Sequence, residues 1–197
     1  MKKLILASRN ENKVEELTLF LSDMNLEVLS LSNFPAVPQV AEDGATFQEN
    51  ALKKARAIYE VTKIPSLADD SGLEVFFLNG RPGVRSARYA GDYAKDEENN
   101  EKLLGEMLGV PPRRRRAQFR CVLALVGSGF EDLTEGICMG NLAEVPRGTN
   151  GFGYDPVFIP DDFSRTYAEL RSDEKNKISH RARAFRELTK ILRDRFV

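Results

Sequence analysis

The sequence predicts an α/β fold in which helices flank a mixed β-sheet. Strand-like and helix-like segments alternate through the first third of the chain, at residues 3–7, 12–21, 26–31 and 46–61. Two long strand-like segments, 117–127 and 131–145, then follow each other across a turn at Gly127-Ser-Gly. Alternating elements favour parallel strands, whereas consecutive strands joined by a short turn favour antiparallel ones. The two patterns together indicate a sheet of mixed direction.

Length and composition predict a single domain, residues 1–197, because 42% of the residues are hydrophobic and can form a sizeable core. The net charge of −1 gives no long-range attraction to nucleic acid or to an anionic membrane. Phosphate binding would therefore depend on local groups. The apolar run at the N-terminus is too short for a signal peptide or a membrane span, so we expect a cytoplasmic protein without a membrane partner.

Cysteine and histidine usage restricts the metal chemistry. Cys121 and Cys138 stand in strand-like segments without CxxC spacing, and we expect reduced thiols in the core. The single histidine, His180, excludes a histidine-rich metal site. Any metal is expected to be a hard cation held by carboxylates.

Three helices are expected after residue 45. The pattern Thr46-Phe-Gln-Glu is typical of a capping box, and predicts a helix that begins there and continues to about Val61. At 100° per residue from Phe47, its inward stripe consists of Ala51, Ala55 and Ile58. Lys54 falls almost on this stripe, where it either snorkels to an edge or meets an anion, whereas Lys53 points away. The other helices are expected at 96–108 and after Ser179, with Ala182, Phe185, Leu188, Ile191 and Leu192 facing the core.

Asp69-Asp70-Ser71-Gly72 lies between two expected strands, 64–69 and 73–78. Carboxylates at a strand end before a glycine turn lie where α/β sheets keep their ligands. Neighbouring side chains of an extended segment point to opposite faces, so we expect one aspartate to face the site and the other to be structural. Glu42 and Asp43 provide further oxygen ligands for Mg²⁺, although loop carboxylates in water are the alternative.

Ser8-Arg-Asn10-Glu-Asn-Lys13 connects the first strand to the first helix. A helix N-terminus offers free N–H groups to an anion, and Ser8, Asn10 and Lys13 would add donors. An ordinary turn with asparagine as the helix cap is the alternative.

Two later segments are further candidates for a functional site. Gly148–Pro156 holds three glycines around Phe152, on which a flat ring could stack, while Asp155 could accept hydrogen bonds from a base edge. A glycine-rich hairpin with a core phenylalanine is the alternative. In Lys175–Arg181, His180 and Arg181 fall in the first turn of a helix, where cations oppose the helix dipole, so local stability does not explain them and a function would. A histidine that is structural or simply exposed is the alternative.

The run Arg113–Arg116 suggests either a nucleic-acid patch or, as we prefer given the neutral total charge, a solvated loop before a strand. It is also a candidate boundary between lobes.

Six motifs in order resemble the inosine triphosphate pyrophosphatase family, also called the dITP/XTP or non-canonical purine NTP pyrophosphatases. They are Ser8-x-Asn10-x-x-Lys13, Glu42-x-Gly44-x-Thr46-Phe47-x-Glu49-Asn50-Ala51, Ala68-Asp-Asp-Ser-Gly-Leu73, Pro82-Gly-Val-x-Ser86-Ala-Arg-Tyr89, Gly151-Phe-Gly-Tyr-Asp-Pro156 and Ser179-His-Arg181. The resemblance implies a two-lobed fold around a long central mixed sheet, a substrate cleft between the lobes, and a homodimer. It also implies Mg²⁺-dependent hydrolysis of ITP, dITP and XTP to the monophosphate and pyrophosphate, which cleanses the nucleotide pool.

The resemblance assigns roles to individual positions. It implies triphosphate contacts from Ser8, Asn10, Lys13, Lys54 and Ser71. It implies that Glu42 and Asp70 hold Mg²⁺ and that Asp70 is also the base that activates water. Phe152 resembles the stacking ring, with Gly153 and Tyr154 beside it in the substrate-binding set. The purine edge would be read by Asp155, Lys175, His180 and Arg181.

Two rival functions stay open on the sequence alone. One is a pyrophosphatase of similar fold that acts on other nucleotides, such as the Maf-like enzymes on dTTP or UTP. The other is a non-catalytic nucleotide-binding or RNA-binding module that uses the arginine run.

Overall fold

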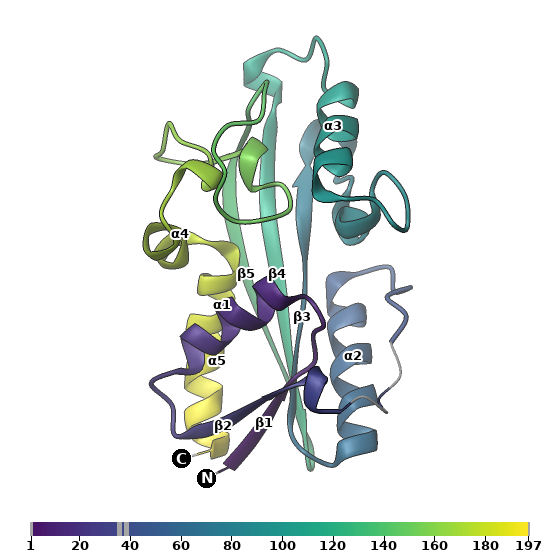
Figure 1. Ribbon diagram of the computed structural model, residues 1–197, viewed down its shortest axis with the longest axis vertical. Coiled ribbons are helices and arrows are strands. Elements are labelled where there is room, and N and C mark those ends of the chain that lie inside the picture. The colour runs from purple at the N-terminus through teal and green to yellow at the C-terminus, as the bar shows by residue number, and fades with distance from the viewer. Residues whose placement is uncertain (1, 35–36, 38–39, 197) are drawn as a thin grey trace. The chain divides into compact units, whose positions relative to one another are not determined.

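Six strands form one sheet in the computed structural model, which describes residues 2–34, 37 and 40–196 (Figure 1). The strands are β1 (Lys2–Leu6), β2 (Leu26–Ser30), β3 (Ser66–Val75), β4 (Arg116–Gly127), β5 (Phe130–Leu142) and β6 (Phe158–Pro160). Their order in the sheet is β2-β1-β3-β4-β5-β6. β1 is parallel to β2 and β3, whereas β5 and β6 are antiparallel, so the predicted mixed sheet is confirmed.

The described residues also form five α-helices: α1 (Glu11–Leu21), α2 (Phe47–Thr62), α3 (Asp96–Glu106), α4 (Ser172–Ile178) and α5 (His180–Phe196). Sequence patterns predict all of these except α4, which is only seven residues long. None of the helices in the described part of the chain is long and apolar enough to cross a membrane.

The chain folds as two compact units. The first comprises Met1–Asp70, Cys121–Gly136 and Arg181–Val197, and the second comprises Ser71–Arg120 and Ile137–His180. Strands β3, β4 and β5 contribute residues to both units.

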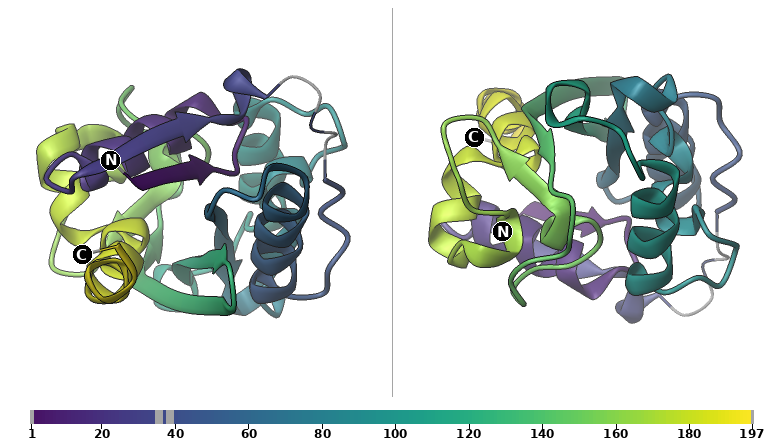
Figure 2. Two further views of the ribbon diagram at one scale, coloured as in Figure 1. Left: turned by 90° about the horizontal axis from the view of Figure 1, so that it is seen from below. Right: turned by 90° about the horizontal axis from the view of Figure 1, so that it is seen from above.

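In the first unit, α1 and α5 lie on one face of the strands and α2 lies on the other (Figures 1 and 2). Leu17 of α1 and Leu188 of α5 pack into one apolar cluster with Leu6 of β1 and Leu67 of β3. The predicted inward face of α5 is confirmed, since Ala182, Phe185, Leu188 and Leu192 are buried. Cys121 lies in the same cluster as a free thiol, as expected.

Helix α2 begins where the capping pattern predicts. The Thr46 hydroxyl accepts a hydrogen bond from the Glu49 backbone N–H at 3.1 Å, which satisfies one of the free donors of the first turn. The predicted inward stripe is buried, Lys54 is buried with it, and Lys53 is exposed.

The second unit packs around Phe119 of β4. Its ring contacts Phe158 edge-on and stacks on Tyr167 and His180. Leu103 of α3 and Met107, the residue after that helix, belong to the same cluster, together with the buried Cys138, which forms no disulfide. This cluster supports the loop Gly148–Tyr154 that leads into β6.

The prediction of two strands separated by a glycine turn at Gly72 is wrong. Residues Ser66–Val75 form one continuous strand, and the chain turns only at the 3-10 helix Phe76–Leu78. Asp69 and Asp70 need no break in the strand because each carboxylate meets a cation inside the fold. The two carboxylates therefore lie in the middle of β3 rather than at its end.

The preferred interpretation of Arg113–Arg116 as a solvated loop is wrong for Arg115. Its guanidinium is buried and donates to three backbone carbonyls, those of Met107, Leu142 and Ala143. Arg116 forms a two-point pair with Asp161. At least half of the run is thus committed to holding the second unit together, which disfavours a nucleic-acid patch.

Candidate active site

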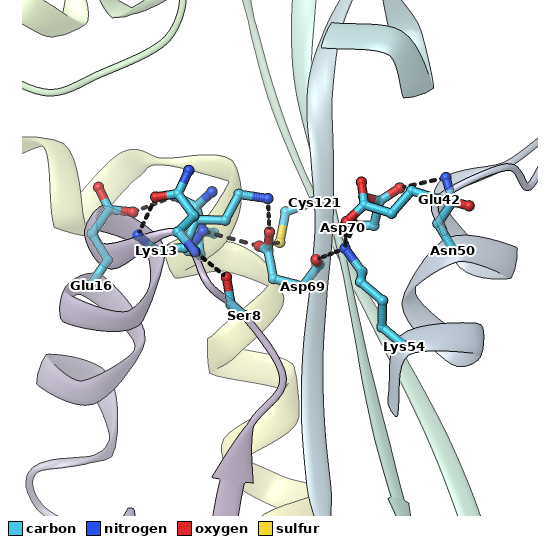
Figure 3. A network of polar contacts seen from close by, with 11 residues as sticks. Ser8, Lys13, Glu16, Glu42, Asn50, Lys54, Asp69, Asp70 and Cys121 are labelled. Carbon is cyan, nitrogen blue, oxygen red and sulfur yellow. Dashed lines mark hydrogen bonds and ion pairs between the residues drawn. The ribbon is translucent and has the colours of Figure 1, made fainter. Parts of the chain in front are cut away.

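The middle of β3 carries the polar centre of the first unit (Figure 3). Asp69 and Asp70 point to opposite sides of the strand, as the alternation of an extended chain requires. The Asp69 side faces α1 and the start of α5, and the Asp70 side faces α2. The expectation that the two aspartates have different surroundings is confirmed.

On the α2 side, two carboxylates share one ammonium. Lys54 Nζ donates to Glu42 Oε1 at 2.8 Å and to Asp70 Oδ1 at 3.2 Å. It also donates to the Asp69 backbone carbonyl at 2.6 Å. Asn50 Nδ2 donates to the other Asp70 oxygen at 3.2 Å. Lys54 therefore meets anions rather than snorkelling to an edge.

Burial dominates the acid–base character of Asp70. Loss of hydration raises the pKa of its carboxyl, and the attraction of Lys54 and Lys13 offsets this only in part. For Lys54, burial alone would lower the ammonium pKa, but Asp70 and Glu42 reverse the effect and raise it.

On the other side of β3, Asp69 is fully enclosed by cations. Lys13 Nζ pairs with one of its oxygens, and Arg181 Nε donates to the other at 3.0 Å. The Cys121 thiol also donates to that second oxygen, at 3.1 Å. Burial by itself would raise the pKa of Asp69, but Lys13 and Arg181 outweigh it and hold the pKa well below its usual range. Asp69 is therefore a permanent anion that fixes two cations.

Arg181 is almost completely enclosed by the fold. Only 1% of the residue is exposed, and its guanidinium pairs with Asp69 and with Glu16 of α1. The structure thus gives Arg181 a structural set of contacts, and its predicted role at the purine edge stays a prediction.

The turn between β1 and α1 has the local structure of the capping alternative. Asn10 is the N-cap of α1, and its Oδ1 accepts from the Lys13 backbone N–H at 3.2 Å. The Ser8 hydroxyl accepts from the Asn10 N–H at 3.2 Å. Capping and anion binding are compatible, because the first turn of a helix has four free N–H groups and one cap satisfies only part of them.

Glu42 and Asp70 fit the needs of a magnesium ion. Both present carboxylate oxygens to the same ammonium, so their oxygens converge on one point that already favours positive charge. Mg²⁺ is commonly held by one or two carboxylates while water and phosphate complete its shell. Among the described residues there is no group of three or more histidine, cysteine or acidic side chains arranged for a metal. A two-carboxylate site is the arrangement that these residues offer.

In the second unit, two of the predicted base-binding residues, Asp155 and Lys175, contact Phe152. Lys175 Nζ lies 4.9 Å from the centre of the Phe152 ring and donates to Asp155 Oδ2 at 2.6 Å. The same Asp155 oxygen accepts the Phe152 backbone N–H at 3.0 Å. Asp155 and Lys175 are both buried, so they hold the residue that carries the ring.

The remaining predicted residues have clear positions. His180 is buried and stacks on Phe119, with ring centres 4.6 Å apart. The Tyr154 hydroxyl donates to the Ser86 backbone carbonyl at 2.8 Å. Ser71 follows Asp70 on β3 and is half-buried. The glycine-rich hairpin suggested as an alternative does not form, because residues 143–154 are an irregular loop.

The first unit contains one group of predicted residues: Ser8, Asn10, Lys13, Glu42, Lys54, Asp70 and Arg181. The second unit contains the others: Ser71, Phe152, Gly153, Tyr154, Asp155, Lys175 and His180. Sequence reasoning missed Glu16 and the role of Asn50. Asn50 could have been found, because it is three residues after Phe47 and a polar group on a buried helix face needs a partner.

Comparison with known proteins identifies the family of this chain. The Ham1 family model matches residues 4–191. A dITP/XTP pyrophosphatase of Geobacter sulfurreducens is 49% identical over 185 residues, covering 93% of each chain. One of Bacillus licheniformis is 50% identical over 193 residues, covering 98% of each.

Among solved structures, a HAM1 protein from Coxiella burnetii superposes with a TM-score of 0.91 at 42% identity. The alignment covers 98% of this chain and 100% of that one. The match extends over nearly the whole sequence and includes both units, so the chain belongs to the Ham1 family.

Proposed function

We propose that this protein hydrolyses dITP, XTP and ITP to the nucleoside monophosphate and pyrophosphate, and so removes non-canonical purines from the nucleotide pool. The similar proteins from Geobacter sulfurreducens and Bacillus licheniformis carry the name dITP/XTP pyrophosphatase and align over nearly their full length. The observation that supports the chemistry best is the buried Asp70 carboxylate, which shares the Lys54 ammonium with Glu42.

In the proposed reaction, water attacks the α-phosphorus and the bond from that phosphorus to the α–β bridging oxygen breaks. Asp70 accepts the proton that the water loses, and pyrophosphate leaves with the bridging oxygen. Burial raises the pKa of Asp70, and Mg²⁺ held by the same carboxylate would lower it, so the metal would share in activating the water.

Lys13 and Lys54 supply the positive charge for the triphosphate. Both ammonium groups are held in place by internal carboxylates, so little reorganisation is needed when phosphate arrives. The first turn of α1 adds free backbone N–H groups, and the hydroxyls of Ser8 and Ser71 add neutral donors.

Glu42 and Asp70 are the proposed ligands of Mg²⁺. When bound, Mg²⁺ would neutralise phosphate charge and lower the pKa of a coordinated water. Lys54 lies between the same two carboxylates and limits their mutual repulsion.

For the purine, we propose stacking on Phe152 and recognition of the 6-oxo group by Lys175 or another cation. The Lys175 ammonium lies 4.9 Å from the centre of the Phe152 ring, which places a cation near the ring on which the base would stack. Adenine presents an amino group at position 6, which cannot accept a hydrogen bond from a cation. A buried donor left unpaired costs about 1–3 kcal/mol, which supports rejection of adenine nucleotides.

Two further parts of the proposal come from the family resemblance. The protein is proposed to be a homodimer and to act in the cytoplasm. Light scattering after size-exclusion chromatography tests the first point, since a mass near that of one 22.2 kDa chain would contradict it.

Product analysis in ¹⁸O-labelled water tests the reaction. With dITP and Mg²⁺, we expect dIMP and pyrophosphate with the label in dIMP, because attack occurs at the α-phosphorus. Label in pyrophosphate would place the attack at the β-phosphorus, and formation of dIDP and orthophosphate would overturn the proposal. A parallel panel with dTTP, UTP and dATP tests the rival nucleotide classes.

A further inference from the structure

The loop that carries Phe152 is hydrogen-bonded to helix α3, which has no role in the proposed function. Gly153, the next residue, has both of its backbone polar groups bound by α3. Its N–H donates to Asp96 Oδ2 at 2.6 Å, and its carbonyl accepts from Asn100 Nδ2 at 2.9 Å. Asp96 and Asn100 are four residues apart, so they lie on one face of the helix. We call this pair of contacts the α3 clamp.

The clamp acts on a backbone that needs external support. Gly153 has φ +63 and Gly151 has φ +76, both in the left-handed region. Glycine gains the most freedom in an unheld loop, so such a segment samples many conformations unless hydrogen bonds restrict it. With the clamp in place, Gly153 cannot rotate its peptide groups without breaking two hydrogen bonds.

The face of Gly153 on which a side chain would stand is open. A Cβ placed there would meet no heavy atom within 4 Å, whereas one on Gly151 would lie 2.0 Å from Asp155 Oδ2. Apart from the neighbouring residues Phe152 and Tyr154, nothing in the fold covers this face of the residue that the clamp holds. This is what a ligand needs when it approaches a backbone closely.

Asn100 is buried with one side-chain oxygen that has no hydrogen-bond partner in the described part of the chain. It is 6% exposed, and its Oδ1 has no hydrogen-bond partner among the described residues. Leaving a buried carbonyl oxygen unpaired costs free energy. Asn100 keeps this unfavourable orientation, and in it the amide N–H donates to Gly153. The Asn100 side chain is thus oriented to hold the loop, although one of its own polar atoms stays without a partner among the described residues.

We propose that Asp96 and Asn100 are positioning residues that preorganise the Phe152 loop for the purine base. This inference rests on the proposed function, because Phe152 is the stacking ring there. A preorganised loop spends less binding energy on ordering, so loss of the clamp raises KM more than it lowers kcat.

The decisive variants are Asp96→Ala, Asp96→Asn and Glu97→Ala. In Asp96→Asn the side chain retains an oxygen that can accept the hydrogen bond from the Gly153 N–H, so KM for dITP should stay close to that of wild type. Glu97 is an exposed acidic residue in the same helical turn, so its alanine variant removes the same charge from the first turn without touching Gly153. We expect Asp96→Ala to raise KM for dITP at least fivefold with kcat within about twofold, and Glu97→Ala to change neither.

A double-mutant cycle with Phe152→Ala separates positioning from general stability. If the clamp acts through the ring, Asp96→Ala should raise KM by less than twofold when Phe152 is already absent. An equal rise in both backgrounds would overturn the inference, as would equal KM values for Asp96→Ala and Glu97→Ala.

Hydrogen exchange without nucleotide distinguishes this inference from the proposed function. Amides of residues 151–154 should exchange faster in Asp96→Ala than in wild type and Glu97→Ala. Unchanged exchange would overturn the clamp even in an enzyme that hydrolyses dITP. Faster exchange in Asp96→Ala, in a protein that neither binds nor hydrolyses dITP, would show that the clamp orders the loop. The same result would overturn the proposed function and the role of the clamp in base binding.

Discussion

Asp69 and Asp70 are neighbours on β3 whose side chains have opposite electrostatic surroundings. Asp69 is paired with Lys13 and Arg181, and its pKa lies well below the usual range. Asp70 meets Lys54 and an asparagine, and burial raises its pKa. One carboxylate is thus fixed as an anion, while the other is suited to exchange protons.

Asp70→Asn should therefore remove activity and preserve the fold. The amide can keep the contact with Lys54 but cannot accept a proton, so we expect kcat to fall about 100- to 10,000-fold. The matched control is Asp69→Asn, which removes the anion shared by Lys13 and the buried Arg181. Breaking a buried pair costs about 3–5 kcal/mol, so this variant should show a marked loss of Tm. Turnover near wild type in Asp70→Asn would exclude Asp70 as the base.

Lys54→Ala should weaken nucleotide binding. Hydrogen bonds to charged groups contribute about 1.5–3 kcal/mol, which corresponds to a rise in KM for dITP on the order of 10- to 100-fold. Lys53→Ala is the control, because Lys53 is one residue away, exposed and paired only with Asp43 at the surface. Equal KM values for both variants would mean that Lys54 serves only to neutralise Glu42 and Asp70.

Arg181→Ala tests whether the residue is structural or reads the base. Its removal leaves Asp69 and Glu16 short of a partner, so we expect a loss of stability of about 3–5 kcal/mol, measured by urea unfolding. The exposed Arg193 on the same helix gives the control variant Arg193→Ala. The ratio of kcat/KM for dITP and dATP decides the second role, since a ratio equal to that of wild type would remove Arg181 from base recognition.

Gly151→Ala and Gly153→Ala form a matched pair within the Phe152 loop. Both residues have positive φ, so each alanine introduces backbone strain of about 1–2 kcal/mol. Only the alanine at 151 also collides with Asp155, whose oxygen holds the Phe152 N–H and Lys175. We expect Gly151→Ala to lower Tm further than Gly153→Ala, and the reverse order in a thermal melt would contradict this structure of the loop.

The elements that the sequence predicts well depend on contacts within a few residues. The start of α2 follows from Thr46 and Glu49, three residues apart, and the inward position of Lys54 follows from helical periodicity alone. The opposite orientation of Asp69 and Asp70 follows from the geometry of an extended chain. The candidate residues of the first unit were found in this way and through motifs.

Only the tertiary structure decided which partner each group meets. Asp69 pairs with Lys13 and Arg181, which are 56 and 112 residues away in the sequence, and Arg115 binds carbonyls of both α3 and β5 regions. The continuity of β3 through Gly72 is decided in the same way, because burial and ion pairing of the aspartates outweigh the local tendency of Ser-Gly to turn. The sequence by itself determined which side chains could bind phosphate or metal or accept a proton. The fold determined their charge states and partners, because desolvation and pairing depend on neighbours that local patterns do not specify.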